Sequence, residues 1–163
     1  MRGKKHAASL AALMLAIVAV SCAKEAPPDV AAERKEIARV VGSSITWAMD
    51  KNVDLLFSSV AQDSAFFIFN PDSAGTIVGF DAFKDMVNDV FMRPEFKATG
   101  SSIRDMRIDL SRSGDVAWYS AILDDFGEVG GKPYAWRNAR WTGVLEKRGG
   151  KWVIAQMHFS FAQ

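Results

Sequence analysis

The sequence predicts an α+β fold in which a curved antiparallel sheet wraps around three helices from the N-terminal half of the domain. Helical spacing of apolar residues is confined to the chain before Pro94, and four long strand-like segments run from Phe96 to the end. Helices segregated from strands, without β-α-β alternation, are typical of the α+β class. A single curved sheet buries the apolar faces of the helices and the strands together.

Residues 1–21 are predicted to be an export signal rather than part of the fold. A basic start, with Arg2 and two lysines, precedes an apolar run over residues 7–20. That run is short for a permanent membrane helix, which takes about 20 residues. We therefore expect the signal to be removed.

Cys22, the only cysteine, follows the apolar run at once. The tetrapeptide at residues 19–22 (AVSC) resembles a bacterial lipobox, in which the cysteine is acylated and becomes the new N-terminus. We expect a lipoprotein anchored in the bacterial cell envelope, facing the periplasm or the cell surface, with residues 22–29 as tether and residues 30–163 as one domain. Ordinary secretion with an incidental cysteine is the alternative.

The charge of the predicted mature chain argues against nucleic acid as a partner. The signal holds three of the 20 Lys+Arg and none of the 19 Asp+Glu, so that 17 basic and 19 acidic residues remain, a net charge of −2. Phosphate binding requires a basic patch, which this well-mixed composition does not predict. A lone cysteine also excludes a disulfide scaffold.

The mature chain keeps one histidine, His158, because His6 leaves with the signal. One histidine excludes the common His-rich zinc sites, and no glycine-rich phosphate loop or G-x-S-x-G elbow is present. We therefore expect no metal and no cofactor. His158 is the only candidate with an ordinary pKa near neutrality.

Three helices are expected from the spacing of apolar residues. The first runs from about Asp29 or Ala31 to Asp50. The second follows as LLFSSVA, with Asn52 or Asp54 as its N-cap. The third covers about Asp81 to Met92 and is stopped by Pro94.

Six strands are expected around these helices. Ser64–Asn70 and the GTIVGF segment form a short hairpin, and long strands cover about 97–110, 115–127, 132–147 and 151–162. The last two are joined by Gly149-Gly150, which can both take the positive φ of a tight hairpin turn. Direct pairing across this turn puts Leu145 opposite Ile154, Gly143 opposite Gln156 and Trp141 opposite His158.

Because side chains alternate along a strand, this register separates two faces of the hairpin. One face carries Trp141, Gln156, His158 and Ser160, and we expect it to line a cavity. The other face carries residues such as Arg140, Thr142 and Met157, and we expect it to meet a partner.

Arg140 is expected opposite Phe159 among apolar neighbours, where a guanidinium needs a carboxylate partner. An ion pair with Asp124, Asp125 or a dimer mate, and an anionic ligand, are the alternatives. Arg137 is expected to point the opposite way, on the face of His158.

Several segments resemble the SnoaL-like branch of the nuclear-transport-factor-2-like superfamily. They are Trp47-Ala48 before Asp54, GFDAFKDMV, SGDVAWYSAIL and, most strongly, RWTGVLEKRGGKWVIAQMHFS. A Gly-Lys-Trp hairpin followed by His-x-Ser is also similar to the association domain of calmodulin-dependent protein kinase. The resemblance covers about residues 30–163 and implies a cone-shaped fold with a pocket, frequently dimeric through its sheet. The superfamily includes cyclases, isomerases, dehydratases and oligomerisation domains, so it does not settle a function.

The function that these residues predict is binding of a small, largely apolar ligand in the cone by a homodimer. Aromatic side chains suit such a ligand. An isomerase, dehydratase or cyclase that uses His158 with a carboxylate is the first alternative, and Asp124 or Asp125 can supply that carboxylate at the cavity rim. An oligomerisation module is the second alternative. The simplest interpretation of His158 itself is a structural histidine whose ring nitrogens are satisfied. The candidate ligand-binding residues are Trp47, Phe69, Trp118, Trp141, Gln156, His158 and Ser160.

Overall fold

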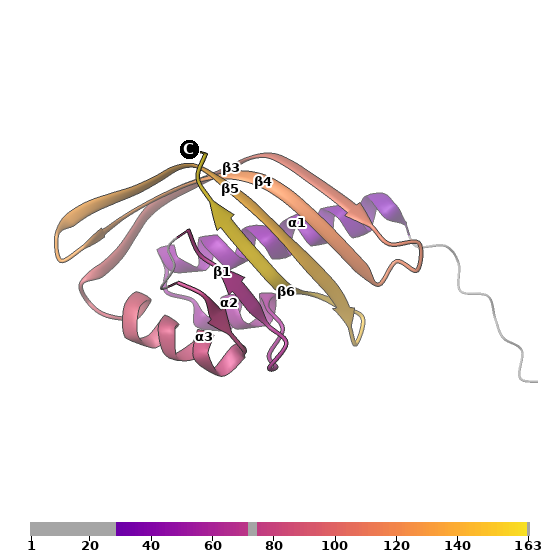
Figure 1. Ribbon diagram of the computed structural model, residues 1–163, viewed down its shortest axis with the longest axis horizontal. Helices are drawn as coiled ribbons and strands as arrows, with labels where there is room; N and C mark the ends of the chain where they lie inside the picture. The colour runs from indigo at the N-terminus through magenta and orange to yellow at the C-terminus, as the bar shows by residue number, and fades with distance from the viewer. Residues whose placement is uncertain (1–28, 72–74, 163) are drawn as a thin grey trace, which may run out of the picture.

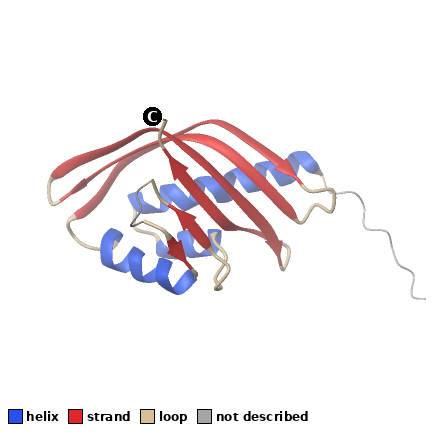
Figure 2. Cartoon of the chain, in the orientation of Figure 1, coloured by secondary structure: helices blue, strands red, loops and turns tan. Residues whose placement is uncertain are grey.

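The computed structural model describes residues 29–71 and 75–162. Four long strands arch over the first helix, with the remaining helices and a short hairpin packed beside it on the inner side of the arch (Figures 1 and 2). This arrangement confirms the predicted α+β fold, a curved sheet around three helices. Residues 1–28, with the predicted signal and Cys22, lie outside the described residues. The elements are α1 (Val30–Thr46), η1 (Trp47–Met49), α2 (Val53–Ser59), β1 (Phe67–Phe69), β2 (Ile77–Val78), α3 (Phe80–Met86), η2 (Val87–Phe91), β3 (Phe96–Leu110), β4 (Val116–Val129), β5 (Lys132–Arg148) and β6 (Lys151–Ser160).

Two of the helices, α1 and α2, begin at side-chain caps. Asp29 accepts hydrogen bonds from the backbone N–H groups of Ala31 (3.0 Å) and Ala32 (3.2 Å), which starts α1. Asn52 accepts one from Leu55 N–H (3.0 Å), so Asn52 rather than Asp54 caps α2. Each bond satisfies a donor that has no partner within its own helix.

The third predicted helix is present but changes its winding. It is α-helical over Phe80–Met86 and continues as a π-helical turn, η2, over Val87–Phe91. The chain leaves this turn before Pro94, which cannot continue a helix. Val90 and Phe91 at its end reach the candidate site described below.

The sheet has the order β2-β1-β6-β5-β4-β3. All neighbouring pairs are antiparallel except β1 with β6, which run parallel. The hairpin of β1 and β2 is confirmed, although β1 covers only three residues of the predicted Ser64–Asn70 strand. The four long strands begin and end within two residues of their predicted limits.

The turn of the last hairpin is as predicted, with Gly149 at φ 56° and Gly150 at φ 80°. Leu145 also pairs with Ile154 as predicted, but beyond that pair the predicted register is wrong. A β-bulge leaves Ala155 as an extra residue, so that Val144 pairs with Gln156 and Trp141 with Phe159. An extra residue reverses the faces of everything that follows it on one strand.

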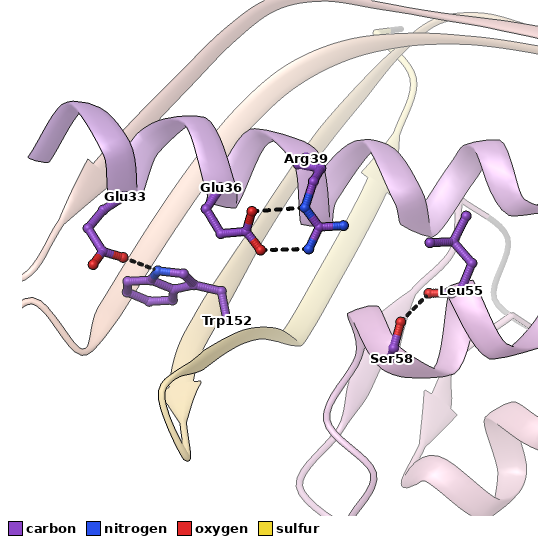
Figure 3. Close-up of polar contacts among 6 residues, drawn as sticks. All are labelled: Glu33, Glu36, Arg39, Leu55, Ser58 and Trp152. Atoms are coloured by element: carbon purple, nitrogen blue, oxygen red, sulfur yellow. Dashed lines mark hydrogen bonds and ion pairs between the residues drawn. The ribbon is translucent and has the colours of Figure 1, made fainter.

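The tip of this hairpin is fastened to the start of α1 through Glu33. The Glu33 carboxylate accepts hydrogen bonds from Lys147 Nζ and from Trp152 Nε1, and Figure 3 shows the second of these. These bonds, that of Lys147 first, lower the pKa of Glu33. One turn further along α1, Glu36 and Arg39 form an ion pair at 2.6 Å on the exposed surface (Figure 3).

Candidate functional site

A cavity of about 450 Å³ lies between the inner face of the sheet and the helices. The C-terminal half of α1 and η1 form one wall, and α3 with η2 forms another. The inner faces of β3 to β6 form the roof. Most of the lining is aromatic or aliphatic; it comprises Ser44, Ile45, Trp47, Ala48, Leu56, Ile68, Asn70, Phe83, Met86, Val90, Phe91, Phe96, Ala98, Leu123, Asp125, Val129, Tyr134, Trp136, Met157 and Phe159.

Asp125 on β4 is the one charged side chain among the described residues that line this cavity. It pairs directly with Trp136 on β5, and Tyr134 stands two residues further along the same strand. Side chains of a directly opposed pair lie about 5 Å apart on the same face. Burial raises the pKa of Asp125 to about 6, against a smaller lowering by the backbone N–H of Phe126. A carboxyl group of this kind changes its charge close to neutral pH.

Tyr134 supplies a phenol close to that carboxyl group. Burial, and after it the charge of Asp125, raise the pKa of Tyr134 to about 12. The phenol therefore keeps its proton at neutral pH and remains a hydrogen-bond donor. Its ring lies over Gly127, where an added Cβ would be 2.5 Å from Tyr134 Cε1. Glycine at position 127 therefore leaves the space that the Tyr134 ring occupies in the cavity wall.

Two other polar lining groups are already hydrogen-bonded within the protein. Ser44 Oγ donates to the carbonyl oxygen of Val41 (2.8 Å), and Asn70 Nδ2 donates to that of Gly75 (2.6 Å). Among the described residues no ion pair reaches Asp125. Asp125 and Tyr134 are consequently the polar groups best placed to meet a bound molecule.

Of the seven predicted ligand-binding residues, the structure places Trp47 in the cavity lining. Trp141 is buried in the core behind it, stacked on Phe159 at 5.6 Å between ring centroids. Trp118 and Phe69 have exposed side chains and do not line the cavity.

Gln156, His158 and Ser160 lie on the outer face of the sheet, so the prediction that their face lines the cavity is wrong. The bulge at Ala155 is the reason, because it turns Met157 and Phe159 inward in their place. His158 makes an edge-to-face contact with the exposed ring of Phe69, with 6.0 Å between centroids. A reaction inside the cavity cannot use His158 from this position.

Arg137 shares the outer face with His158 as predicted, but Arg140 lies on that face too, so the two arginines do not point opposite ways. Arg140 is exposed and pairs with Ser160, because the bulge moves Phe159 opposite Trp141. Asp124, its suggested partner, instead binds Arg104 Nη2 at 2.9 Å. Arg137 is exposed too, with its guanidinium 4.9 Å from the centroid of the Phe126 ring. Neither arginine lines the cavity.

The outer face of the sheet carries a second, shallow hollow. Trp118 and Gln156 contribute to it together with Thr142 and Val144. Trp118 is a large apolar side chain with about half of its surface exposed, 49%. Phe69, exposed to 47% beside His158, is a second large apolar side chain on the outer face.

Neither a metal cluster nor a membrane-spanning helix is found in the described part of the chain. No three His, Cys, Asp or Glu side chains there lie close enough together to hold a metal ion. No helix among residues 29–71 and 75–162 combines the length and the hydropathy needed to cross a membrane.

The fold agrees with what comparisons with known proteins find. The SnoaL-like domain family matches residues 10–163, and the chain belongs to this family. No curated protein matches the sequence.

Solved structures share the fold at low sequence identity. An NTF2-like protein of unknown function from Prochlorococcus marinus has a TM-score of 0.63 at 16% identity, covering 80% of this chain and 93% of its own. A candidate scytalone dehydratase from Novosphingobium aromaticivorans has a TM-score of 0.69 at 13% identity, covering 82% and 86%. The association domain of C. elegans CaMKII has a TM-score of 0.61 at 18% identity, covering 80% and 97%. At such identities the likeness establishes the NTF2-like fold alone.

Proposed function

We propose that this chain is an envelope lipoprotein whose cavity binds a small, largely apolar ligand. The observation that carries the proposal is the 450 Å³ cavity, lined mainly by aromatic and aliphatic side chains with one carboxyl group among them. Pockets for small molecules typically combine an apolar lining with a few polar groups that fix orientation. Aromatic rings from Trp47, Phe91 and Trp136 give flat surfaces for such a ligand.

Binding is tested with the full chain and a neutral apolar probe, neopentylbenzene. At a probe concentration near 100 times its Kd, the free energy of unfolding rises by about 2.7 kcal/mol if the probe binds only the folded state. Ala98→Phe fills the cavity from β3 and should abolish this gain. Ala135→Phe adds the same ring at an exposed position of β5 and should leave the gain intact. Equal stabilisation of both variants would place the probe outside the cavity and refute the proposal.

Native ligand is sought by mass spectrometry of intact protein purified under mild conditions. A bound small molecule that is lost from Ala98→Phe identifies the ligand class. An empty protein that no neutral apolar probe stabilises counts against the proposal.

The proposed location in the cell envelope rests on the sequence at residues 19–22. Metabolic labelling with a palmitate analogue should mark the wild-type chain and leave Cys22→Ser unlabelled. Labelling of Cys22→Ser, or no labelling of the wild type in a bacterial host, contradicts the anchor.

A homodimer through the outer face of the sheet completes the proposal. Support comes from the exposed ring of Trp118 beside its half-buried cross-strand partner Val144. The likeness to an association domain is compatible with such an assembly.

Acid–base catalysis is the second candidate function, with Asp125 in the place expected for His158. A carboxyl group with a pKa of about 6 is well suited to act as a general base near neutrality. The phenol of Tyr134 can donate a hydrogen bond to an oxygen that gains negative charge as Asp125 removes a neighbouring C–H proton.

This chemistry is tested by proton exchange of a neutral carbon acid, 2-tetralone, in D2O. The wild-type chain should accelerate incorporation of deuterium next to the carbonyl group, and Asp125→Asn should lose that acceleration. Equal rates for the two proteins would remove Asp125 as the base.

A further inference from the structure

The charge that the described residues place in the cavity lining is negative only. Asp125 is its only charged lining residue, and no Lys, Arg or His of the described chain lines it. A neutral apolar ligand leaves this carboxylate without a counter-charge inside a largely apolar wall. Removing a charge from water without a partner is costly, and burial accordingly raises the pKa of Asp125.

The adjacent residue, Asp124, has an ionic partner within the protein. Its carboxylate accepts hydrogen bonds from Arg104 Nη2 (2.9 Å) and from the backbone N–H of Asn138 (2.7 Å) on the outer side of the sheet. The bulge at Asn138 keeps Arg137 outside as well, over the Phe126 ring. The carboxylate of Asp124 is therefore hydrogen-bonded within the protein, whereas no Lys, Arg or His of the described residues lines the cavity with Asp125.

Aromatic residues of the neighbouring strands line the cavity together with Asp125. Trp136 is the direct cross-strand partner of Asp125, and Tyr134 stacks on Phe96 with 6.2 Å between centroids and 30° between planes. Trp136 in turn meets Phe159 edge to face at 5.6 Å. Aromatic faces carry partial negative charge and attract cations, most strongly where water is excluded.

We propose that the cavity selects an organic cation with an apolar body, such as a quaternary or tertiary ammonium compound, which Asp125 and the surrounding aromatic rings bind together. This inference rests on the proposed ligand-binding function and names the substrate class of the same site. The carboxylate supplies the counter-charge, and the rings of Trp136, Tyr134 and Phe96 supply faces for the ammonium group.

The test compares two probes of nearly the same shape, benzyltrimethylammonium and neopentylbenzene, with the full chain by ligand-observed NMR. Both carry a benzyl group, and only the first is charged. At pH 7.5 the cation should bind wild-type protein at least tenfold more tightly than the neutral probe. Asp125→Asn should remove that preference, while Asp89→Asn, which removes the same charge from an exposed position of η2, should retain it.

A pH series separates Asp125 from general surface charge, because benzyltrimethylammonium stays charged at every pH. Affinity should rise about tenfold between pH 5 and pH 7.5 as Asp125 ionises around its pKa of about 6. Tyr134 is the only other titratable side chain that lines the cavity, and its pKa of about 12 keeps it protonated throughout. The affinity of Asp125→Asn should be flat over this range.

Three outcomes distinguish this inference from the proposed function. Preference for the cation that disappears in Asp125→Asn alone supports it. Equal or tighter binding of neopentylbenzene overturns the cation inference and leaves the apolar cavity standing. Failure of both probes overturns both proposals. Thermal melting of Asp125→Asn serves as the folding control, and the variant should melt no lower than wild type because it lacks the buried charge.

Discussion

At the scale of single residues, two glycines on the long strands differ sharply in what surrounds them. A Cβ added to Gly143 would be 2.4 Å from the carbonyl oxygen of Gln156 and 2.5 Å from Tyr119 Cε1. At Gly100 an added Cβ would meet nothing within 4 Å. The ring of Tyr119 thus lies against the backbone of β5 only because position 143 lacks a side chain.

Gly143→Ala should lower the free energy of unfolding by about 3 kcal/mol, the upper range for overpacking of a core. Gly100→Ala should change it by less than about 1 kcal/mol, because it loses backbone freedom in the unfolded chain without a clash. Urea denaturation of both variants measures the difference. Losses of equal size would show that the contact with Tyr119 does not constrain position 143.

Asp125 gives a second prediction at this scale, in the pH dependence of stability. Its pKa rises from an unfolded value of 3.8 to about 6 on folding, so its favourable contribution is complete below pH 3.8 and is lost as pH passes through 6. A shift of two pKa units corresponds to about 3 kcal/mol, and solvent screening at this partly exposed group reduces the effect to about 1–2 kcal/mol.

Wild-type protein should therefore lose stability relative to Asp125→Asn between pH 4 and pH 6.5, in denaturation curves recorded at matched pH. The comparison is necessary because the pKa values of Glu33, Glu36 and Asp63 are lowered on folding, and these groups act in the opposite direction at lower pH. A constant difference between the two proteins over this range would contradict a raised pKa at Asp125.

At the scale of elements, two long strands, β3 and β5, have irregularities at nearly the same level of the sheet, one on each side of β4. β3 has an irregularity between Arg104 and Arg107, with Asp105 at φ 52°. β5 has one opposite residues 123–125, with Asn138 at φ 55°. Arg104, Asp124 and Asn138 tie the three strands together there on the outer side. Such bulges increase local twist and let a sheet curve around a cavity.

Asn138 is the most direct test of this bend. A positive φ suits glycine and asparagine and disfavours β-branched residues, at a cost of about 1–3 kcal/mol. Asn138→Gly should retain the fold and the affinity of the cavity for its probe, whereas Asn138→Val should reduce both. Chemical denaturation and probe titration measure the two effects. A valine variant as stable as the glycine variant would show that the bulge does not depend on this conformation.

These bulges mark the limit of what could be predicted from the sequence. The order of helices and strands, the caps and the turn at Gly149-Gly150 follow from local propensity, and the structure confirms them. The face that a side chain takes beyond a bulge depends on the curvature of the sheet and on contacts with distant parts of the chain. One such contact is the hydrogen bond that Ala61 N–H donates to Ile154 O, at 2.8 Å. Pairing by simple alternation therefore placed Gln156 and His158 on the wrong face.

The sequence nevertheless carries a signal for both bulges on the last hairpin. Along β6 the inward residues are Trp152, Ile154, Met157 and Phe159, so their spacing is two, three and two. Along β5 the same spacing separates Tyr134, Trp136, Ala139 and Trp141. A spacing of three within an alternating apolar pattern indicates an extra residue, and applying it brings Tyr134, Trp136, Met157 and Phe159 into the cavity lining. Asp124 and Asp125 were both candidates for a carboxylate at the cavity rim, and the structure places Asp125 in the cavity lining.

At the scale of the whole molecule, the first helix separates the predicted anchor from the cavity. α1 begins at Val30, at the end of the chain that leads to the tether, and the cavity is lined by its last turns from Ser44 onward. A helix of 17 residues is about 25 Å long. In Figure 1 the start of α1 lies toward one end of the domain and α3 toward the other. The cavity is lined by α3 and by the last turns of α1, and so lies away from the start of α1.

The outer face of the sheet gives the last prediction, that the protein is a dimer in solution. Trp118 stands on this face with 49% of its surface exposed, beside its half-buried cross-strand partner Val144. Covering a ring of this size on both partners removes apolar surface from water, worth about 25 cal/mol per Å². Trp118→Glu should place two charges at the two-fold interface and dissociate it, so that the chain sediments as a monomer at micromolar concentration. Met49→Glu, at a side chain of equal exposure (51%) on η1, should leave the dimer intact. A wild-type monomer, or dissociation by Met49→Glu to the same degree, would show that the sheet face is not the interface.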